Sequence, residues 1–386
     1  MLHKRNPRPA MRGRYLVRSS KAFAILSLMD IVLSVFRRPP PPVPNQLSRI
    51  VVANGAHLGD MLITLPAIAA LRKTYPNATL GVIAGSWTKP VVEWSGLVDE
   101  IHIFDHWSHN RKPHKRWTNY VASRRSALAE LRDAKYEVGI DFYPFFPPTH
   151  PLFYAAGIPI RIGFDSGGFG PLLTHSVAWR NASMPIAEHL RDLLACIPNQ
   201  LLNEADLAMQ LQRPKVLPRG LESDSYIVIH PGTGASFKEW EIGKWRQLIA
   251  LLHSRGERLV LTGAGERDQL MSRTLSRLVD LNLVGQLNWK DYAEIIGGAK
   301  AVICPDTVAG HLAALFQVPT VAIFTGTNEL AQWAPNSPFA KTILASVPCA
   351  PCHRPGCDLM TCIRESSVET VLAALDDLKF PDGRQL

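Results

Sequence analysis

The chain has few cysteines, no long hydrophobic run and, over most of its length, no excess of charge of either sign. Six cysteines among 386 residues exclude a small domain held together by disulfides. The longest apolar stretch, Ala22–Phe36, is interrupted by two serines and Asp30 and has 15 residues, whereas a membrane-spanning helix needs about 20. With 46% hydrophobic and 19% charged residues, the chain is neither disordered nor collagen-like and can bury a full core.

The excess positive charge lies entirely at the N-terminus. The formal net charge is +9, and residues 50–386 contain 32 basic and 32 acidic residues. The first 49 residues contain one acid, Asp30, and ten basic residues: Lys4, Arg5, Arg8, Arg12, Arg14, Arg18, Lys21, Arg37, Arg38 and Arg49. A neutral body argues against a dedicated nucleic-acid-binding protein.

Residues 1–48 are predicted to be a basic extension that contains the apolar segment Ala22–Phe36 and a stiff linker, Pro39–Pro44. The apolar segment fits a helix lying in the surface of a bilayer, with positive charges on both sides of it. A cleaved export signal, a membrane span, and an unordered extension or misassigned start remain open. No small-residue cleavage site follows the segment, which runs directly into Arg37 and Arg38. We expect the surface helix, and with it peripheral association with a membrane.

Short β-rich runs alternate with helical patterns from Arg49 onward, and the alternation restarts after a linker near Leu211–Ser223. This pattern predicts two doubly wound α/β domains with parallel sheets, covering residues 49–215 and 221–386. The ligand sites are expected beyond the carboxyl ends of the strands, facing a cleft between the domains. The expected strands are Arg49–Asn54, Thr79–Ala84, Glu100–Phe104, Glu137–Phe142, Tyr226–His230, Arg258–Thr262, Ala301–Cys304 and Thr320–Phe324. The expected helices are Met61–Lys73, Asn119–Ala134, Ile242–Ser254, Glu266–Leu278, Lys290–Gly297 and Val308–Phe316.

The turn after the first expected strand, Asn54–Asp60, lacks both the GxGxxG pattern and a P-loop lysine, so a dinucleotide fingerprint fails there. The turn instead places a carboxylate, Asp60, at the start of a helix. Asp60 could cap that helix or act in catalysis, and the local pattern favours a cap. His57, taken alone, is an ordinary loop histidine.

Three turns at strand ends in the second half carry small and polar residues. Small residues allow close approach to a ligand, hydroxyls and a lysine can hold phosphates, and exposed helix-terminal amides favour an anion. The alternatives are a solvated lysine, helix caps and a core histidine. Taken together, the turns indicate a phosphorylated ligand, and a nucleotide in particular. The candidate residues are Thr233, Lys238, Glu266, Asp306, Thr307, Gly310 and His311.

Four of the six cysteines, Cys349, Cys352, Cys357 and Cys362, lie within 14 residues. A structural metal, a disulfide and a loop of reduced cysteines are all compatible with this spacing, and we favour reduced cysteines. Because the other two cysteines are isolated in apolar contexts, the chain is expected to be cytosolic.

From Arg49 to about Leu375 the chain resembles the heptosyltransferase-like glycosyltransferases, family 9, of bacterial lipopolysaccharide assembly. The resemblance rests on the cysteine-rich tail and on four segments: GAHLGDMLITLPAIAALRKTYPNA, IHPGTGASFKEWEIGKWRQL, LTGAGERDQ and CPDTVAGHLAALFQVPTVAIFTGTNELAQWAP. It implies GT-B architecture, with two Rossmann-like domains that bind the acceptor and the sugar nucleotide respectively. It also implies metal-independent, inverting transfer without a resident cofactor, usually of heptose from ADP-heptose.

The family motifs assign roles to individual residues. Asp60 falls on the catalytic aspartate, Lys238 and Thr233 on the donor-phosphate loop, and Glu266 near the nucleoside. The phosphate-binding turn falls on Asp306, Thr307 and His311, with Val308 where glycine is usual and Gly310 two residues further on.

The acceptor is expected to be an acidic glycolipid at the cytoplasmic face of the inner membrane. A basic loop between residues 106 and 117 would capture it, and Trp107 and Trp117 would stack on sugar faces; a solvated connection is the alternative. The predicted acceptor-binding residues are His57, Arg111, Lys112, Lys115 and Arg116. A different nucleotide-hexose donor, or a catalytically silent nucleotide- or glycan-binding member, remains the alternative to heptosyl transfer.

Overall fold

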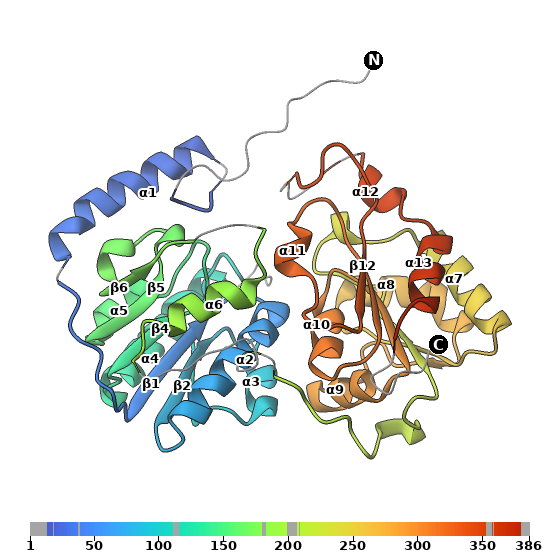
Figure 1. Ribbon diagram of the computed structural model, residues 1–386, viewed down its shortest axis with the longest axis horizontal. Helices are drawn as coiled ribbons and strands as arrows, with labels where there is room; N and C mark the ends of the chain where they lie inside the picture. Colours follow the sequence, from blue (N-terminus) through green and yellow to red (C-terminus); the bar gives the residue numbers. More distant parts are fainter. Residues whose placement is uncertain are drawn as a thin grey trace. The chain divides into compact units, whose positions relative to one another are not determined.

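The computed structural model describes residues 14–379, apart from residues 18, 38, 111–115, 180–182, 199–206, 208, 353–356 and 358. The chain divides between Met209 and Gln210 into two compact units, each with its own sheet (Figure 1). We call them the N-terminal unit and the C-terminal unit. The sequence placed the boundary between residues 215 and 221, a few residues further along the chain.

The N-terminal unit has a six-stranded parallel sheet in the order β3-β2-β1-β4-β5-β6. This is the Rossmann order, in which the chain reverses direction across the sheet between β1 and β4. The strands are β1 Arg49–Asn54, β2 Thr79–Ala84, β3 Glu100–Ile103, β4 Val138–Asp141, β5 Ile160–Phe164 and β6 His175–Val177. The α-helices are α1 Ser20–Leu33, α2 Leu58–Thr74, α3 Lys89–Ser95, α4 Arg116–Ala134, α5 His150–Ala156 and α6 Ile186–Leu194.

The C-terminal unit repeats the arrangement, with the order β12-β11-β10-β7-β8-β9 and all its pairings parallel. The strands are β7 Ile227–Ile229, β8 Leu259–Leu261, β9 Leu281–Asn282, β10 Ala301–Pro305, β11 Thr320–Ile323 and β12 Ala340–Ile343. The α-helices are α7 Ile242–Ser254, α8 Glu266–Leu275, α9 Trp289–Gly298, α10 Val308–Leu315, α11 Leu330–Trp333, α12 Thr361–Arg364 and α13 Val368–Asp376. The two sheets confirm the predicted doubly wound α/β fold class.

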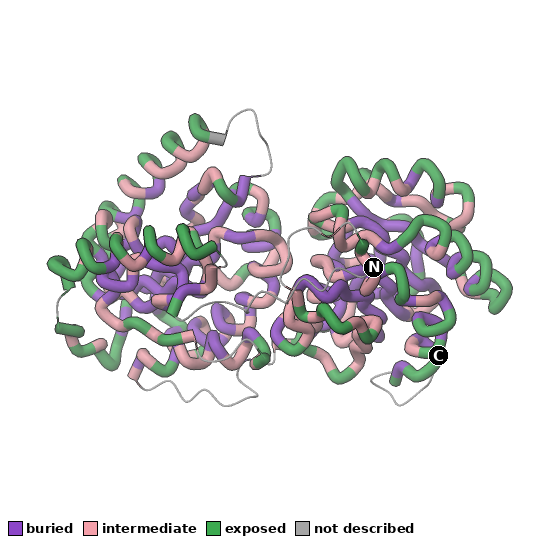
Figure 2. The backbone as a smooth tube through the Cα atoms, turned by 90° about the horizontal axis from the view of Figure 1, so that it is seen from above, coloured by how far each residue is buried: buried purple, intermediate pink, exposed green. Residues whose placement is uncertain are grey.

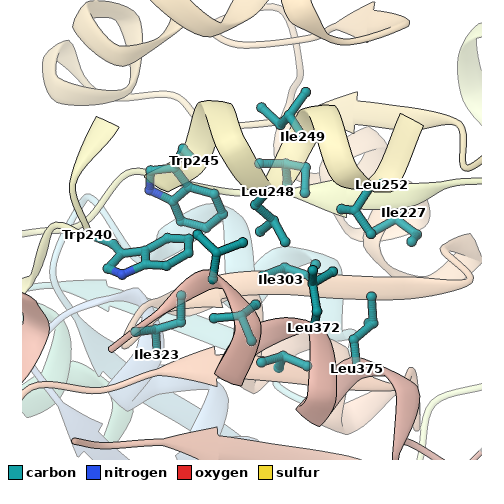
Figure 3. Packing of buried hydrophobic residues seen from close by; sticks show 14 of the residues in the cluster. Ile227, Trp240, Trp245, Leu248, Ile249, Leu252, Ile303, Ile323, Leu372 and Leu375 are labelled. Carbon is teal, nitrogen blue, oxygen red and sulfur yellow. The ribbon is translucent and has the colours of Figure 1, made fainter. Parts of the chain in front are cut away.

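Alternate residues of the central strands face one helical layer of the C-terminal unit. Ile227 of β7 and Ile303 of β10 pack with Leu248 of α7 and Leu375 of α13, all fully buried (Figure 3). The Trp240 and Trp245 rings meet edge to face, 5.0 Å apart. Burial on both faces makes these strands continuous apolar runs, which is why the sequence predicted them closely.

Helix α2 begins at Leu58, three residues before the predicted start. The N-cap is His57, and the Asp60 side chain, at the third helical position, accepts a hydrogen bond from the backbone N–H of His57 (3.1 Å). This reciprocal arrangement is a capping box, so the expectation that Asp60 itself is the N-cap is wrong. In α8 the α-helix ends at Leu275, and the predicted remainder, Ser276–Leu278, is a 3₁₀ turn.

None of the helices in the described part of the chain combines the length and the hydropathy needed to cross a membrane.

Candidate active site

Asn54, the last residue of β1, holds the turn that carries Asp60. The Asn54 side-chain amide donates to the Thr64 hydroxyl (2.8 Å) and to the Asp60 backbone carbonyl (3.2 Å), and its oxygen accepts from the Ala56 N–H (3.1 Å). The Thr64 hydroxyl also donates to the Asp60 carbonyl (2.8 Å). Asp60 is thus held at the carboxyl end of the central strand, where doubly wound sheets place their ligands.

Aromatic and imidazole side chains surround this turn. The His57 ring lies 5.8 Å from the His109 ring, and His109 Nε2 lies 3.3 Å from the Tyr143 hydroxyl. Burial raises the pKa of Tyr143, and the carboxylates of Asp60 and Asp141 raise it further, which places its hydroxyl within the field of Asp60. Burial lowers the pKa of His109 to about 4, so His109 is neutral at pH 7.

The loop that presents Tyr143 is held by a buried carboxylate at the end of β4. Asp141 accepts from the backbone N–H of Tyr143 (3.0 Å) and of Thr149 (2.5 Å), and lies 3.5 Å from His150. Burial raises the pKa of Asp141 to about 7 and lowers that of His150 to about 3. Asp141 therefore holds the backbone of the loop that presents Tyr143, and is itself fully buried.

The predicted basic loop is only partly described. Arg111, Lys112 and Lys115 lie outside the described residues, and Arg116 begins α4. Trp107 and Trp117 stack on each other, with ring centroids 5.0 Å apart and an interplanar angle of 23°. Trp117 is 60% exposed, so one outer ring face remains for a ligand.

In the C-terminal unit, Lys238 and Asp306 form the centre of the candidate donor site. Lys238 follows β7 and Asp306 follows β10, the adjacent strand. The Lys238 ammonium lies 2.5 Å from Asp306 Oδ2, which also accepts from the Asn328 side-chain amide (3.0 Å). Only 8% of the Asp306 side chain is exposed, against 21% for Lys238. Lys238 is therefore the more exposed member of the pair.

The start of α10 lies directly beside this pair. Thr307, not Asp306, is the N-cap of α10, which corrects the cap alternative for Asp306. Burial lowers the pKa of His311, while the nearby Asp306 raises it and Lys238 lowers it. A Cβ at Gly310 would lie 3.2 Å from Pro335 and 3.4 Å from Cys304, so this glycine allows α10 to pack closely on β10.

The turns that follow β7 and β8 are held by hydrogen bonds of their own. The Thr233 hydroxyl donates to the Ala235 carbonyl (2.5 Å), and Glu266 is the exposed first residue of α8. Asp268, which the sequence analysis missed, accepts from the N–H groups of Ala264 (3.1 Å) and Gly265 (2.8 Å). A Cβ at Gly232 or Gly263 would collide with the Asp268 side chain, so this carboxylate packs directly against both turns, and the positive φ of Gly263 also favours glycine there.

The six cysteines are free thiols, and all of them lie in the described residues, so no disulfide closes the C-terminal segment. Burial and the neighbouring thiols of the other three cluster members raise the pKa of Cys349. Among the residues that the structure describes, no three His, Cys, Asp or Glu side chains are grouped so as to hold a metal ion.

The structure therefore adds Asn54, His109, Tyr143, Asp268 and Asn328 to the predicted site residues. Asp268 lies at the third position of its helix, the same capping position as Asp60, and that spacing could have revealed it. Tyr143 and His109 are brought together from separate loops, and nothing local in the sequence indicates this.

Solved structures share the fold. The structure of E. coli ADP-heptose lipopolysaccharide heptosyltransferase II matches with a TM-score of 0.65 and 20% identity, covering 85% of this chain and 97% of that one. E. coli heptosyltransferase WaaC with ADP matches with a TM-score of 0.66 and 17% identity, covering 84% and 98%. Two Rossmann-like units with polar turns at the strand ends are the architecture of a GT-B glycosyltransferase.

Curated relatives narrow the class. Lipopolysaccharide heptosyltransferase 1 of Pseudomonas aeruginosa is 25% identical, covering 80% of this chain and 87% of its own length. Lipopolysaccharide heptosyltransferase 3 of E. coli is 23% identical, covering 72% and 83%. The model of glycosyltransferase family 9 (heptosyltransferase) matches residues 124–362, and the chain belongs to this family. The predicted resemblance is confirmed, and the protein is a glycosyltransferase.

Proposed function

We propose that this glycosyltransferase moves heptose from ADP-heptose onto a lipid-linked saccharide of the lipopolysaccharide core, with inversion at the anomeric carbon and without a metal ion. The support from relatives is that several bear the name lipopolysaccharide heptosyltransferase, and that related structures contain ADP or ADP-2-deoxy-2-fluoro heptose. The residues that would carry the reaction are those at the strand ends of the two units.

Asp60 is proposed as the general base. An acceptor hydroxyl must lose its proton as its oxygen attacks the anomeric carbon, and a positioned carboxylate can accept that proton. Asn54 holds the Asp60 backbone carbonyl and the capping-box hydrogen bond holds its carboxylate, so the side chain needs little reorganisation. His57 and the half-buried Tyr143 would contact the acceptor beside it.

Lys238 and the start of α10 are proposed to neutralise the diphosphate. The observation that carries the proposal is the Lys238–Asp306 pair at the ends of two adjacent strands. An ammonium has three N–H donors, and the contact with Asp306 uses one of them. The helix-terminal N–H groups after Thr307 add a favourable field for an anion, which strengthens as the bond to the sugar breaks. Glu266 would lie near the nucleoside.

Preference for ADP is the first expected result. In a thermal-shift panel of ADP, UDP, GDP and NAD, ADP should raise the unfolding midpoint most, and equally with EDTA present. At a ligand concentration of 100 Kd, mass action stabilises the protein by about 2.7 kcal/mol. A larger shift with UDP or GDP would indicate another sugar-nucleotide donor. A protein that binds a nucleotide but shows neither transfer nor donor hydrolysis would be a catalytically silent member. Transfer from ADP-heptose that stops in EDTA and returns with magnesium would refute the metal-independent mechanism.

The basic loop is expected to act on the acceptor alone. Changing Arg111, Lys112, Lys115 and Arg116 together to Ser should raise the apparent KM for the acceptor and flatten its salt dependence, because four charges that attract acidic groups are removed. The KM for the donor should not change. If acceptor KM and its salt dependence both stay at wild-type values, the loop is a solvated connection.

A reaction on a lipid-linked acceptor occurs at a membrane. We therefore also propose peripheral association with the cytoplasmic face of the inner membrane, with the basic residues 1–48 as the associating part.

A further inference from the structure

Helix α1 and the following 3₁₀ turn η1, Ser34–Phe36, carry an apolar face that points away from the protein. The side chains on this face are 46–78% exposed. Their spacing of three or four residues places them on one side of a continuous helix. Seen from above in Figure 2, green marks the exposed residues along this helix. The face, which we call the outer face, consists of Ile25, Leu28, Ile31, Val32, Val35 and Phe36.

Hydrogen bonds and an ion pair of Asp30 hold the opposite side of α1 to the rest of the N-terminal unit. Asp30, the acid that interrupts the apolar run, is 5% exposed, and Oδ1 accepts from the Phe169 backbone N–H (2.8 Å). Its other oxygen accepts from the Tyr15 hydroxyl (2.8 Å). Arg14 lies 4.0 Å from Asp30 and 3.0 Å from Asp165, while Leu26 packs against Gly168.

The outward side of α1 differs from that of an ordinary surface helix. A helix that covers a core turns its apolar side inward and its charged side to water. In α1 the inner side holds both Leu26 and the charged Asp30, each 5% exposed, and further apolar side chains form the outer face. Because Asp30 has three partners on the protein, rotating α1 to bury Ile31 and Val32 would break these contacts and leave the carboxylate without them, which is unfavourable. The outer face is therefore a fixed feature of this unit.

The charges around the outer face identify what would cover it. Lys21 before it and Arg37 after it are both exposed. Asp30, the only acid in the first 49 residues, is 5% exposed on the inner side, so no acid of this segment faces outward. A second copy would bring two strongly basic extensions together, which repel. A bilayer with anionic lipids satisfies both the apolar stripe and the flanking cations.

We propose that the outer face of α1 and η1 docks on an anionic lipid bilayer, with the helix lying flat in the interfacial layer. The η1 residue Phe36 meets Tyr154 of α5 edge to face at 5.9 Å, so the apolar contact continues onto the body of the N-terminal unit. This inference deepens the membrane association proposed above, because it names the face of residues 1–48 that makes the contact, and it rests on the proposed function in assigning this bilayer as the place where the lipid-linked acceptor is met.

The test is flotation of the full chain with vesicles of phosphatidylcholine, with and without phosphatidylglycerol. The variant Leu28→Gln/Ile31→Gln/Val32→Gln removes the middle of the outer face and keeps good helix formers. The matched control, Val216→Gln/Leu270→Gln/Leu359→Gln, changes three other exposed apolar residues of 62–81% exposure. The wild type and the control should bind anionic vesicles, less so at high salt, and the α1 variant should bind at least about tenfold more weakly.

Two readouts keep the outcomes distinct. Transfer to a delipidated, water-soluble acceptor should be the same for the wild type and the α1 variant. If neither protein shows transfer, the proposed function fails, and vesicle binding still tests the outer face. Equal vesicle binding by the wild type and the α1 variant would overturn the proposal. So would a wild type that does not float with anionic vesicles, or one that forms a dimer in solution that the α1 variant loses.

Discussion

Asp60→Asn is expected to lower kcat for transfer by about 10²–10⁴-fold, the usual contribution of a general base. Asparagine is the informative change because its side-chain oxygen can still accept the hydrogen bond from the His57 N–H that completes the capping box. Donor affinity, measured as the ADP-induced shift of the unfolding midpoint, should stay at the wild-type value because Asp60 acts on the acceptor.

The control for this variant is Asp99→Asn. Asp99 also holds a backbone N–H, that of Leu80 (2.8 Å), and pairs with Arg72, but it precedes β3 and so lies at the amino end of the strands. Its loss should cost stability and leave kcat near wild type. If Asp60→Asn transfers heptose at a rate comparable to Asp99→Asn, then Asp60 is a helix-capping residue and another group is the base.

The sequence predicted most central strands and the edge strand β3 closely, and it missed the edge strands β6, β9 and β12 and the interior strand β5. β1 and β2 have the predicted limits, and β10 and β11 differ by one residue each, because their apolar runs are buried on both faces. Strands such as β9, with two residues, and β6, whose three residues are half-buried or exposed, have no such signal. Their strand form depends on pairing with neighbours, which local sequence does not reveal.

The candidate site shows the same division between local and tertiary information. Lys238 and Asp306 could each be predicted from a polar turn after an apolar strand. Their contact spans 68 positions and exists because β7 and β10 are neighbours in the sheet order. The capping role of Asp60 needed only local information. If α2 is taken to begin at Leu58, three residues before the predicted start, Asp60 falls at the third helical position, where a capping-box side chain lies. The clustering of His109 with Tyr143 depends on loop conformations that no spacing in the sequence encodes.

Lys238→Ala is expected to raise the KM for the donor and to lower kcat together. A hydrogen bond to a charged group contributes about 1.5–3 kcal/mol, which corresponds to about 10–150-fold in kcat/KM. Both constants should change because the ammonium meets the diphosphate in the ground state and meets more charge as the sugar leaves. Lys290→Ala is the control, since it removes an equal charge from a side chain of the same unit that is 73% exposed.

The single variant also leaves Asp306 without its cation, and an unpaired carboxylate of 8% exposure would by itself repel a diphosphate. The double variant Lys238→Ala/Asp306→Asn separates the two effects, because asparagine removes the repelling charge and can still accept from Asn328. If Lys238 contacts the diphosphate directly, the double variant should still bind ADP more weakly than the wild type, although removal of the repelling carboxylate makes it bind no more weakly than Lys238→Ala. Recovery of wild-type ADP affinity in the double variant would mean that the lysine only neutralises Asp306, and the direct phosphate contact would be wrong. Isothermal titration with ADP measures this difference without depending on the acceptor.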